Sequence, residues 1–173
     1  MYTPWGNSQN STVLADGITS VDTASHGGYH LDDKANAKVK MLFPDFRPFA
    51  GEHWYEEDCD WAIVALAFPE LFSDENLRAA INTVNSRYFP LSVQKFLASD
   101  ESKRIRDLVH EWETAHAHLW LTGNMGTSSK NKCIWVSLHR IGDNAEKQAM
   151  FHTWPAKHLY SDQELADPEL VNI

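Results

Sequence analysis

The sequence predicts an α+β fold in which N- and C-terminal β-hairpins form one antiparallel sheet packed against three central helices. Strand-like segments separated by turn residues lie near both ends of the chain, and helix-like apolar periodicity occupies its middle. The chain has 173 residues, 43% of them hydrophobic, which is enough to bury a sizeable core. We therefore expect a single globular domain over residues 1–173.

The N-terminal hairpin is predicted from Asp16-Gly17, which separates two apolar runs. Glycine adopts the positive φ that tight hairpin turns need, so we place strands near 11–15 and 18–23. The stretch "TASHGGYHL" (23–31) follows directly, and Asp32 or Asp33 is expected to cap a short helix over about 33–39. Residues 40–53, with two prolines and a glycine, are expected to form an irregular connection.

The three central helices follow from apolar spacing. The first covers 61–68, where apolar residues recur at i, i+3, i+4 and i+7 and Pro69 ends the pattern. Glu56, Glu57 and Asp58 are expected in its first turn, where the helix dipole favours negative charge. Ser73 is expected to cap the second helix, and a third helical stretch runs from about 92 or 100 to 119.

The C-terminal part is predicted to hold the second hairpin. Residues 122–132, "TGNMGTSSKNK", are expected to form a loop, followed by a strand over 133–141 and its antiparallel return over 148–154. Ser161 and Glu164 have the spacing of a capping box at the start of a short last helix.

The charge distribution narrows the classes of partner. The net charge of −9 argues against a general nucleic-acid binder and against a surface that seeks anionic membranes. The thirty residues between Arg47 and Arg78 contain eight acidic residues and no Lys or Arg. These acids either stabilise helix N-termini or form a face for a basic protein surface. The predicted partner-binding residues are Glu56, Glu57, Asp58, Asp60, Asp74 and Glu75.

Targeting and redox signals are absent from the sequence. Its start has no signal-peptide pattern, no run of about 18 apolar residues occurs, and Cys59 and Cys133 form no CxxC motif. We therefore expect a cytoplasmic protein with free thiols and no membrane contact.

The loop "TASHGGYHL" is the main candidate for chemistry. We expect His26 and His30, with Asp58, to be the catalytic residues if the protein is an enzyme, because imidazole titrates near neutral pH. Two other functional interpretations are a metal pair formed by the two histidines and anion binding by the N–H groups of Gly27 and Gly28. The structural alternative is a Gly-Gly turn whose His rings bind the backbone.

Familiar catalytic and cofactor motifs are missing. The Gly-Gly pair disfavours a helical HxxxH metal site, and "HEWETAH" (110–116) has Thr114 where a zinc protease needs its second His. No G-x-S-x-G, P-loop or G-x-G-x-x-G occurs either. We expect neither a metal nor another cofactor.

Four sequence blocks carry a family resemblance: "TPWGNSQ" (3–9), "DGI" (16–18), "SVDTASHGGYHL" (20–31) and "WYEEDCDWAIVALAFP" (54–69). Together they resemble an uncharacterised domain family of phages, plasmids and other bacterial mobile elements, over roughly residues 1–90. The resemblance implies a bacterial intracellular setting, often among accessory and anti-defence genes. It implies no catalytic residue.

Three functional hypotheses follow. The first is an acidic binding inhibitor of a host defence, of the anti-CRISPR or anti-restriction type, that docks a basic surface of a defence or nucleic-acid enzyme. The second is a hydrolase or transferase that uses His26 and His30 with a carboxylate from 52–60. The third is an accessory domain in which these motifs only support packing. In each case we expect His26 and His30 to hydrogen-bond across to the acidic segment.

Overall fold

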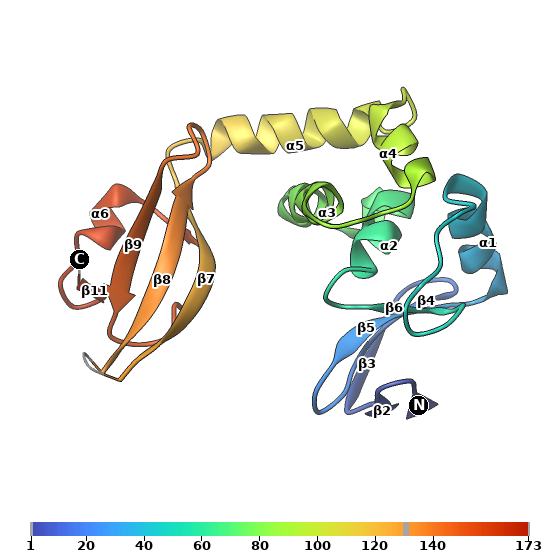
Figure 1. The fold of residues 1–173 in the computed structure, drawn as a ribbon, viewed down its shortest axis with the longest axis horizontal. Coiled ribbons are helices and arrows are strands. Elements are labelled where there is room, and N and C mark those ends of the chain that lie inside the picture. Colours follow the sequence, from blue (N-terminus) through green and yellow to red (C-terminus); the bar gives the residue numbers. More distant parts are fainter. Residues whose placement is uncertain (1, 130–131, 173) are drawn as a thin grey trace. The chain divides into compact units, whose positions relative to one another are not determined.

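The computed structural model describes residues 2–129 and 132–172 of the chain. Helices and antiparallel strands are both present, which confirms the mixed α+β class. The chain divides into two compact units, Met1–Val109 and His110–Ile173, and each is described by itself (Figure 1). The single domain over residues 1–173 stays a prediction.

An antiparallel sheet of four strands, in the order β3-β4-β5-β6, organises the first unit. The strands are β3 (Asn10–Ala15), β4 (Ile18–Asp22), β5 (Gly27–Leu31) and β6 (Trp54–Glu56). Asp16-Gly17 forms the turn between the first two, and Gly17 has the positive φ of +78° expected for it. The N-terminal hairpin is therefore confirmed.

The helices of the first unit begin largely where the capping residues predict. They are α1 (Asp33–Leu42), α2 (Trp61–Ala67), the short 3-10 helix η1 (Pro69–Leu71), α3 (Asp74–Ser86), α4 (Leu91–Ala98) and the first half of α5 (Lys103–Ala115), which continues past the last residue of the unit, Val109. The side chain of Asp32 accepts from the Ala35 N–H at 2.8 Å, and that of Ser73 accepts from the Asn76 N–H at 3.2 Å. The predicted third helical stretch is thus two helices, α4 and α5, whereas α1 is the short helix predicted over about 33–39 and extends to Leu42.

The main core lies between the helices and one face of this sheet. Ile18, Leu31 and Tyr55 project from the sheet into the cluster, and six consecutive residues of α2, 62–67, are buried. A helix that is apolar all round is expected to be central, and Figure 1 shows α2 between the sheet and the other helices of this unit. This arrangement fixes the segment just before α2, which carries most of the predicted site.

The opposite face of the sheet is covered by the N-terminal segment, which contains β1 (Tyr2–Thr3) and β2 (Gly6–Asn7). Trp5 packs edge-to-face on Trp54, with ring centroids 5.8 Å apart, and also lies over Gly28. Val21, the register partner of Gly28, is fully buried. The blocks "TPWG" and "HGGYH" therefore meet in a second, smaller apolar contact.

The second unit contains an antiparallel sheet in the order β10-β7-β8-β9-β11 and the short helix α6. The elements are β7 (Trp120–Ser128), β8 (Cys133–Arg140), β9 (Glu146–Phe151), β10 (Leu159–Tyr160), α6 (Asp162–Leu165) and β11 (Val171–Asn172). Val136, Leu138 and Leu165 are fully buried in its core. Ser161 and Glu164 form the predicted capping box.

Three predictions need correction. The N- and C-terminal strands lie in separate sheets, not in one. Within the predicted loop 122–132, residues 122–128 belong to β7, because pairing with β8 satisfies their backbone; residues 130–131 lie outside the described residues. Glu56 ends β6, and the first turn of α2 contains no acid, so the acidic segment does not stabilise that helix terminus.

No helix in the described part of the chain combines the length and the apolarity that crossing a bilayer requires.

Candidate functional site

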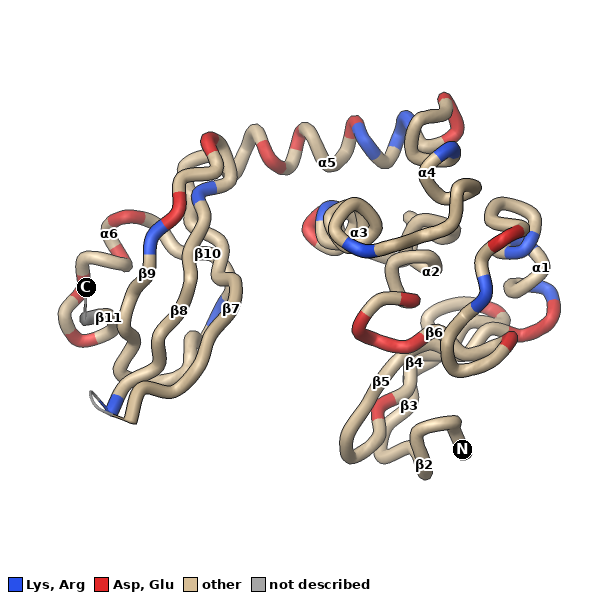
Figure 2. The backbone as a smooth tube through the Cα atoms, in the orientation of Figure 1, with Lys and Arg blue, Asp and Glu red and all other residues tan. Residues whose placement is uncertain are grey.

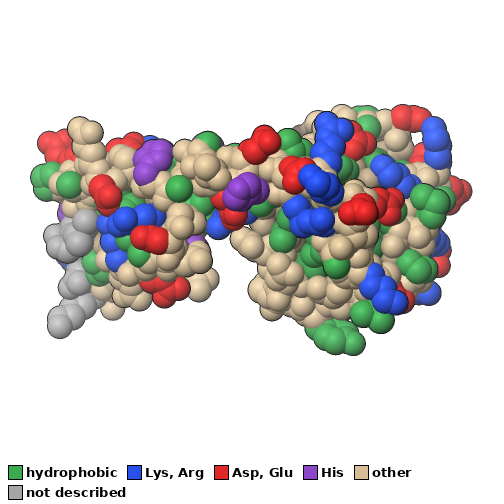
Figure 3. Space-filling view, turned by 90° about the horizontal axis from the view of Figure 1, so that it is seen from above, with side chains coloured by type: hydrophobic (Ala, Val, Ile, Leu, Met, Phe, Trp, Pro, Cys, Tyr) green, Lys and Arg blue, Asp and Glu red, His purple; other side chains and the backbone are tan. Residues whose placement is uncertain are grey.

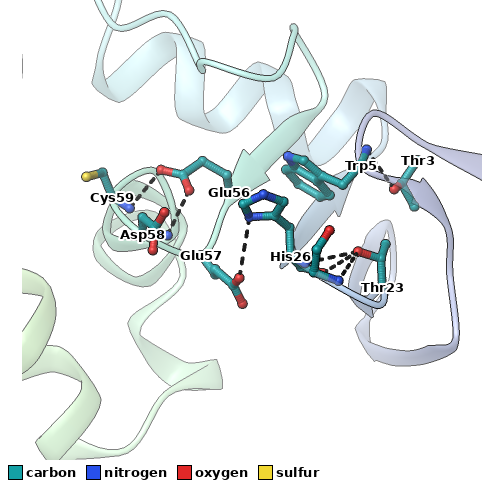
Figure 4. A network of polar contacts seen from close by, with 9 residues as sticks. Thr3, Trp5, Thr23, His26, Glu56, Glu57, Asp58 and Cys59 are labelled. Carbon is teal, nitrogen blue, oxygen red and sulfur yellow. Dashed lines mark hydrogen bonds and ion pairs between the residues drawn. The ribbon is translucent and has the colours of Figure 1, made fainter. Parts of the chain in front are cut away.

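The candidate site is built on the loop Thr23–His26, which connects β4 to β5. The Thr23 hydroxyl donates to the His26 carbonyl at 2.7 Å and accepts from the His26 N–H at 3.1 Å, while the Thr23 N–H donates to the same carbonyl at 2.8 Å. These bonds close the loop on its own backbone (Figure 4). The His26 side chain is held at the end of the sheet, half exposed.

The two glycines of the loop allow two different close approaches. A Cβ on Gly28 would lie 2.7 Å from Cη2 of Trp5 and still closer to the Tyr55 carbonyl oxygen, so only glycine fits there. A Cβ on Gly27 would lie 2.7 Å from a carboxylate oxygen of Glu57 and 3.2 Å from one of Asp22. Two carboxylates beside Gly27 oppose anion binding by the N–H groups of this loop.

His26 faces the acidic segment, but the prediction that its ring and that of His30 hydrogen-bond to this segment is wrong for the described residues. Its Nδ1 lies 3.9 Å from Oε1 of Glu57, too far for a hydrogen bond. Figure 4 shows the imidazole turned toward that carboxylate. Both side chains are about half exposed, so solvent screens this pair and its contribution to stability is small.

His30 lies in a different environment. Its ring contacts Trp54, with centroids 4.6 Å apart, and the His53 ring is at 6.1 Å. Burial lowers the pKa of His30, and the nearby His53 lowers it further. Because four residues of strand extend about 13 Å, His26 and His30 do not act on one group. The predicted set of His26, His30 and Asp58 is not brought together in the structure.

The acidic segment forms a tight turn before α2. The Glu56 carboxylate accepts from the N–H groups of Asp58 and Cys59, both at 2.9 Å (Figure 4). Glu56 therefore shapes the turn, and the exposed side chains of Glu57 and Asp58 project from it. Figure 2 shows this turn between β6 and α2 as a continuous acidic stretch of the backbone.

Asp60 differs from its acidic neighbours because it is only 6% exposed. Its carboxylate accepts from the Phe49 N–H at 2.7 Å. Burial raises the pKa of Asp60 from 3.8 to about 6, although the bond from Phe49 acts in the opposite direction. Among the predicted partner-binding residues, Asp60 is therefore buried, whereas Asp74 and Glu75 are partly exposed in the first turn of α3.

A small pocket of about 190 Å³ adjoins Glu57 and is lined by Ser20, Asp22, Gly28, Tyr29, Glu57 and Trp61. Burial raises the pKa of Tyr29, and the charge of Asp22 adds to this effect. Sequence reasoning missed Asp22 as a site residue. The signal that could have identified Asp22 is the register of the hairpin, because Asp22 pairs with Gly27 and Gly27 lies beside Glu57.

Among the described residues, no three His, Cys, Asp or Glu side chains are grouped closely enough to hold a metal ion. The ring of His53, which lies near His30, is already engaged: its Nδ1 lies 2.8 Å from the Leu31 carbonyl oxygen and its Nε2 lies 3.6 Å from Oδ1 of Asp33. The site therefore offers one imidazole, several carboxylates and a small pocket.

Comparisons with known proteins identify the N-terminal region. The family model described as a domain of unknown function (DUF7007) matches residues 1–118, which span the first unit and the rest of α5. A search of curated proteins and a search of solved structures each gave no significant match. The expected membership of an uncharacterised domain family is confirmed: the chain belongs to the DUF7007 family.

Proposed function

We propose that the protein is a binding protein that docks a basic surface of a partner through the acidic edge of its first unit. This acidic edge consists of Asp22, Glu57 and Asp58, all exposed. The observation that carries the proposal is the convergence of the Asp22 and Glu57 carboxylates beside Gly27, with Asp58 on the same turn as Glu57.

The charges around the acidic edge support this proposal. Within 4.0 Å of the Glu57 carboxylate, in the described part of the chain, the one ion-pair partner is the imidazole of half-exposed His26, and no Lys or Arg lies that close. The first unit as a whole carries sixteen Asp and Glu against ten Lys and Arg. Like charges held together on a surface repel one another, and a basic partner relieves that repulsion.

The nature of the partner follows from the resemblance to domains of phages and mobile elements. Enzymes that act on nucleic acid present basic surfaces to phosphate, so an acidic edge competes for the same surface. We therefore propose a host defence enzyme, of the restriction or CRISPR type, as the partner. Inhibition by binding needs no cofactor.

The test is a plaque assay in a bacterial strain that carries an active restriction or CRISPR system. Expression of the protein is expected to raise the plating efficiency of phage, and the double variant Glu57→Lys with Asp58→Lys to abolish this effect. Asp16→Lys is the matched control, because Asp16 is an exposed acid at the β3–β4 turn. Full activity of the double variant, with an unchanged melting temperature, would contradict the proposed acidic edge.

The second candidate function is a hydrolase or transferase, favoured by one observation: His26 and Glu57 lie 3.9 Å apart next to a pocket. In that case Glu57, in place of the predicted Asp58, orients His26. His26→Ala distinguishes the two functions, because a binding protein keeps its effect in this variant and an enzyme loses it.

A further inference from the structure

A groove on the first unit, independent of the acidic edge, is unexplained by the proposed function. Two hollows of about 280 and 840 Å³ adjoin, since both are lined by Met41, Leu42, Phe96 and Glu101. We call them together the α1–α4–α5 groove. Leu42, Leu66, Phe96, Ile105 and Leu108 give it an apolar floor.

The groove leaves apolar side chains in water. Met41 is 73% exposed on its wall, and Leu91, which lines the larger hollow, is 62% exposed. Exposed apolar side chains that adjoin a hollow of this size are typical of an interaction site. Methionine suits such a wall because its flexible side chain adapts to different partners.

The net charge around the groove is positive, whereas the net charge of the first unit is negative. Lys38, Lys95 and Arg104 line it, and none of these cations has an acidic partner within 4.0 Å among the residues described. Figure 3 shows Lys and Arg side chains interspersed with acidic and hydrophobic ones on the face that carries α4 and the beginning of α5. Arg47 also lines the larger hollow, and the acids of the groove are Asp45, Glu70 and Glu101, so four cations face three acids in this otherwise acidic unit.

We propose that the α1–α4–α5 groove docks an amphipathic helix of a partner protein whose flanks are acidic. An amphipathic helix fits an elongated apolar groove by inserting anchors spaced i, i+3/i+4 and i+7. Two adjoining hollows provide places for successive anchors, and acidic flanks complement the small excess of cations over acids along the groove. This inference goes beyond the proposed function and does not depend on it, because none of its residues belongs to the acidic edge.

The test uses a fluorescent helical peptide of about 18 residues, long enough to be helical in isolation. It has Leu at the anchor positions, Glu on both flanks and Ala elsewhere; a matched peptide has Lys in place of Glu. Anisotropy titrations are expected to show tighter binding of the Glu peptide. Met41→Asp is expected to weaken its binding at least about tenfold, since 1.4 kcal/mol corresponds to that factor.

Two further variants sharpen the test. Lys95→Glu with Arg104→Glu is expected to reverse the preference in favour of the Lys peptide. Val13→Asp is the control, because Val13 is 72% exposed on β3, outside the groove. Equal losses of affinity in Met41→Asp and Val13→Asp, an unchanged preference in the charge variant, or no binding of either peptide would overturn the proposal.

Methyl NMR locates the peptide directly. With ¹³C-methyl methionine, the Met41 resonance is expected to shift on titration, while those of Met125 and Met150, in the second unit, stay in place. A Met41 resonance that moves with protein concentration alone, together with self-association in sedimentation, would identify a second copy of the chain as the occupant and overturn the proposal.

Discussion

Replacing Asp60 by Asn tests the burial of the carboxylate that lies directly before α2. The Asp60 side chain is 6% exposed and accepts from the Phe49 N–H at 2.7 Å. Burial raises its pKa to about 6 in the folded protein, against 3.8 for a solvated Asp. Asn preserves the size of the side chain and an oxygen that accepts from Phe49.

The sign of the effect follows from proton linkage. Between pH 3.8 and about 6 the folded protein holds the Asp60 proton more tightly than the unfolded chain, so stability falls as the pH rises. The stabilisation is complete below pH 3.8 and is lost through pH 6. The folded and unfolded pKa values of Asp60 differ by about two, which corresponds to about 3 kcal/mol in the free energy of unfolding. About 2 kcal/mol of this stabilisation is lost between about pH 4 and 7.

The assay is urea unfolding of the wild type and Asp60→Asn across this pH range, followed by tryptophan fluorescence. The free energy of unfolding of the wild type minus that of the variant is expected to fall by about 2 kcal/mol between about pH 4 and 7. Asp58→Asn serves as the control, because it makes the same substitution at an exposed acid of the same turn. A difference for Asp60→Asn that does not change with pH would refute the burial of this carboxylate.

Three further substitutions test other parts of the fold by the same unfolding assay. Gly28→Ala is expected to destabilise the protein by about 2–4 kcal/mol, because its Cβ meets Trp5 and the backbone. Gly51→Ala, also at a positive φ but in open space, is expected to cost only about 1 kcal/mol. Equal losses in the two variants would contradict the close approach at Gly28. Tyr55→Phe removes the hydroxyl that donates to the buried Asn36 carboxamide at 2.6 Å and is expected to cost about 1–3 kcal/mol; no loss would mean that Asn36 has another donor. Ser161→Ala removes the capping box of α6 and is expected to cost about 1 kcal/mol, most visibly in the second unit.

The candidate site was partly predictable from local sequence. The loop after the first hairpin and the density of acids before α2 are visible in the chain, and their contact through His26 and Glu57 fits the predicted meeting of the two blocks. The sequence could not show which acids of the segment 56–60 bind the backbone, which are buried and which are exposed. Glu56 binds two backbone N–H groups, Asp60 is buried, and Glu57 and Asp58 are exposed. The environment of each carboxylate depends on how the turn packs against β6 and against the segment that contains Phe49.

The sequence by itself determined the features whose interactions are local. Asp16-Gly17 forms its turn, Asp32 and Ser73 cap their helices, and Ser161 forms its capping box, because each needs only neighbours within a few residues. Tertiary structure decided which strands share a sheet. β6 and most of β7 lack a strong strand pattern and exist because β5 and β8 supply hydrogen-bond partners. Tertiary structure likewise placed His26 next to Glu57 and His30 next to Trp54. Strand pairing determines what each ring contacts, whereas the four-residue spacing of the two histidines does not.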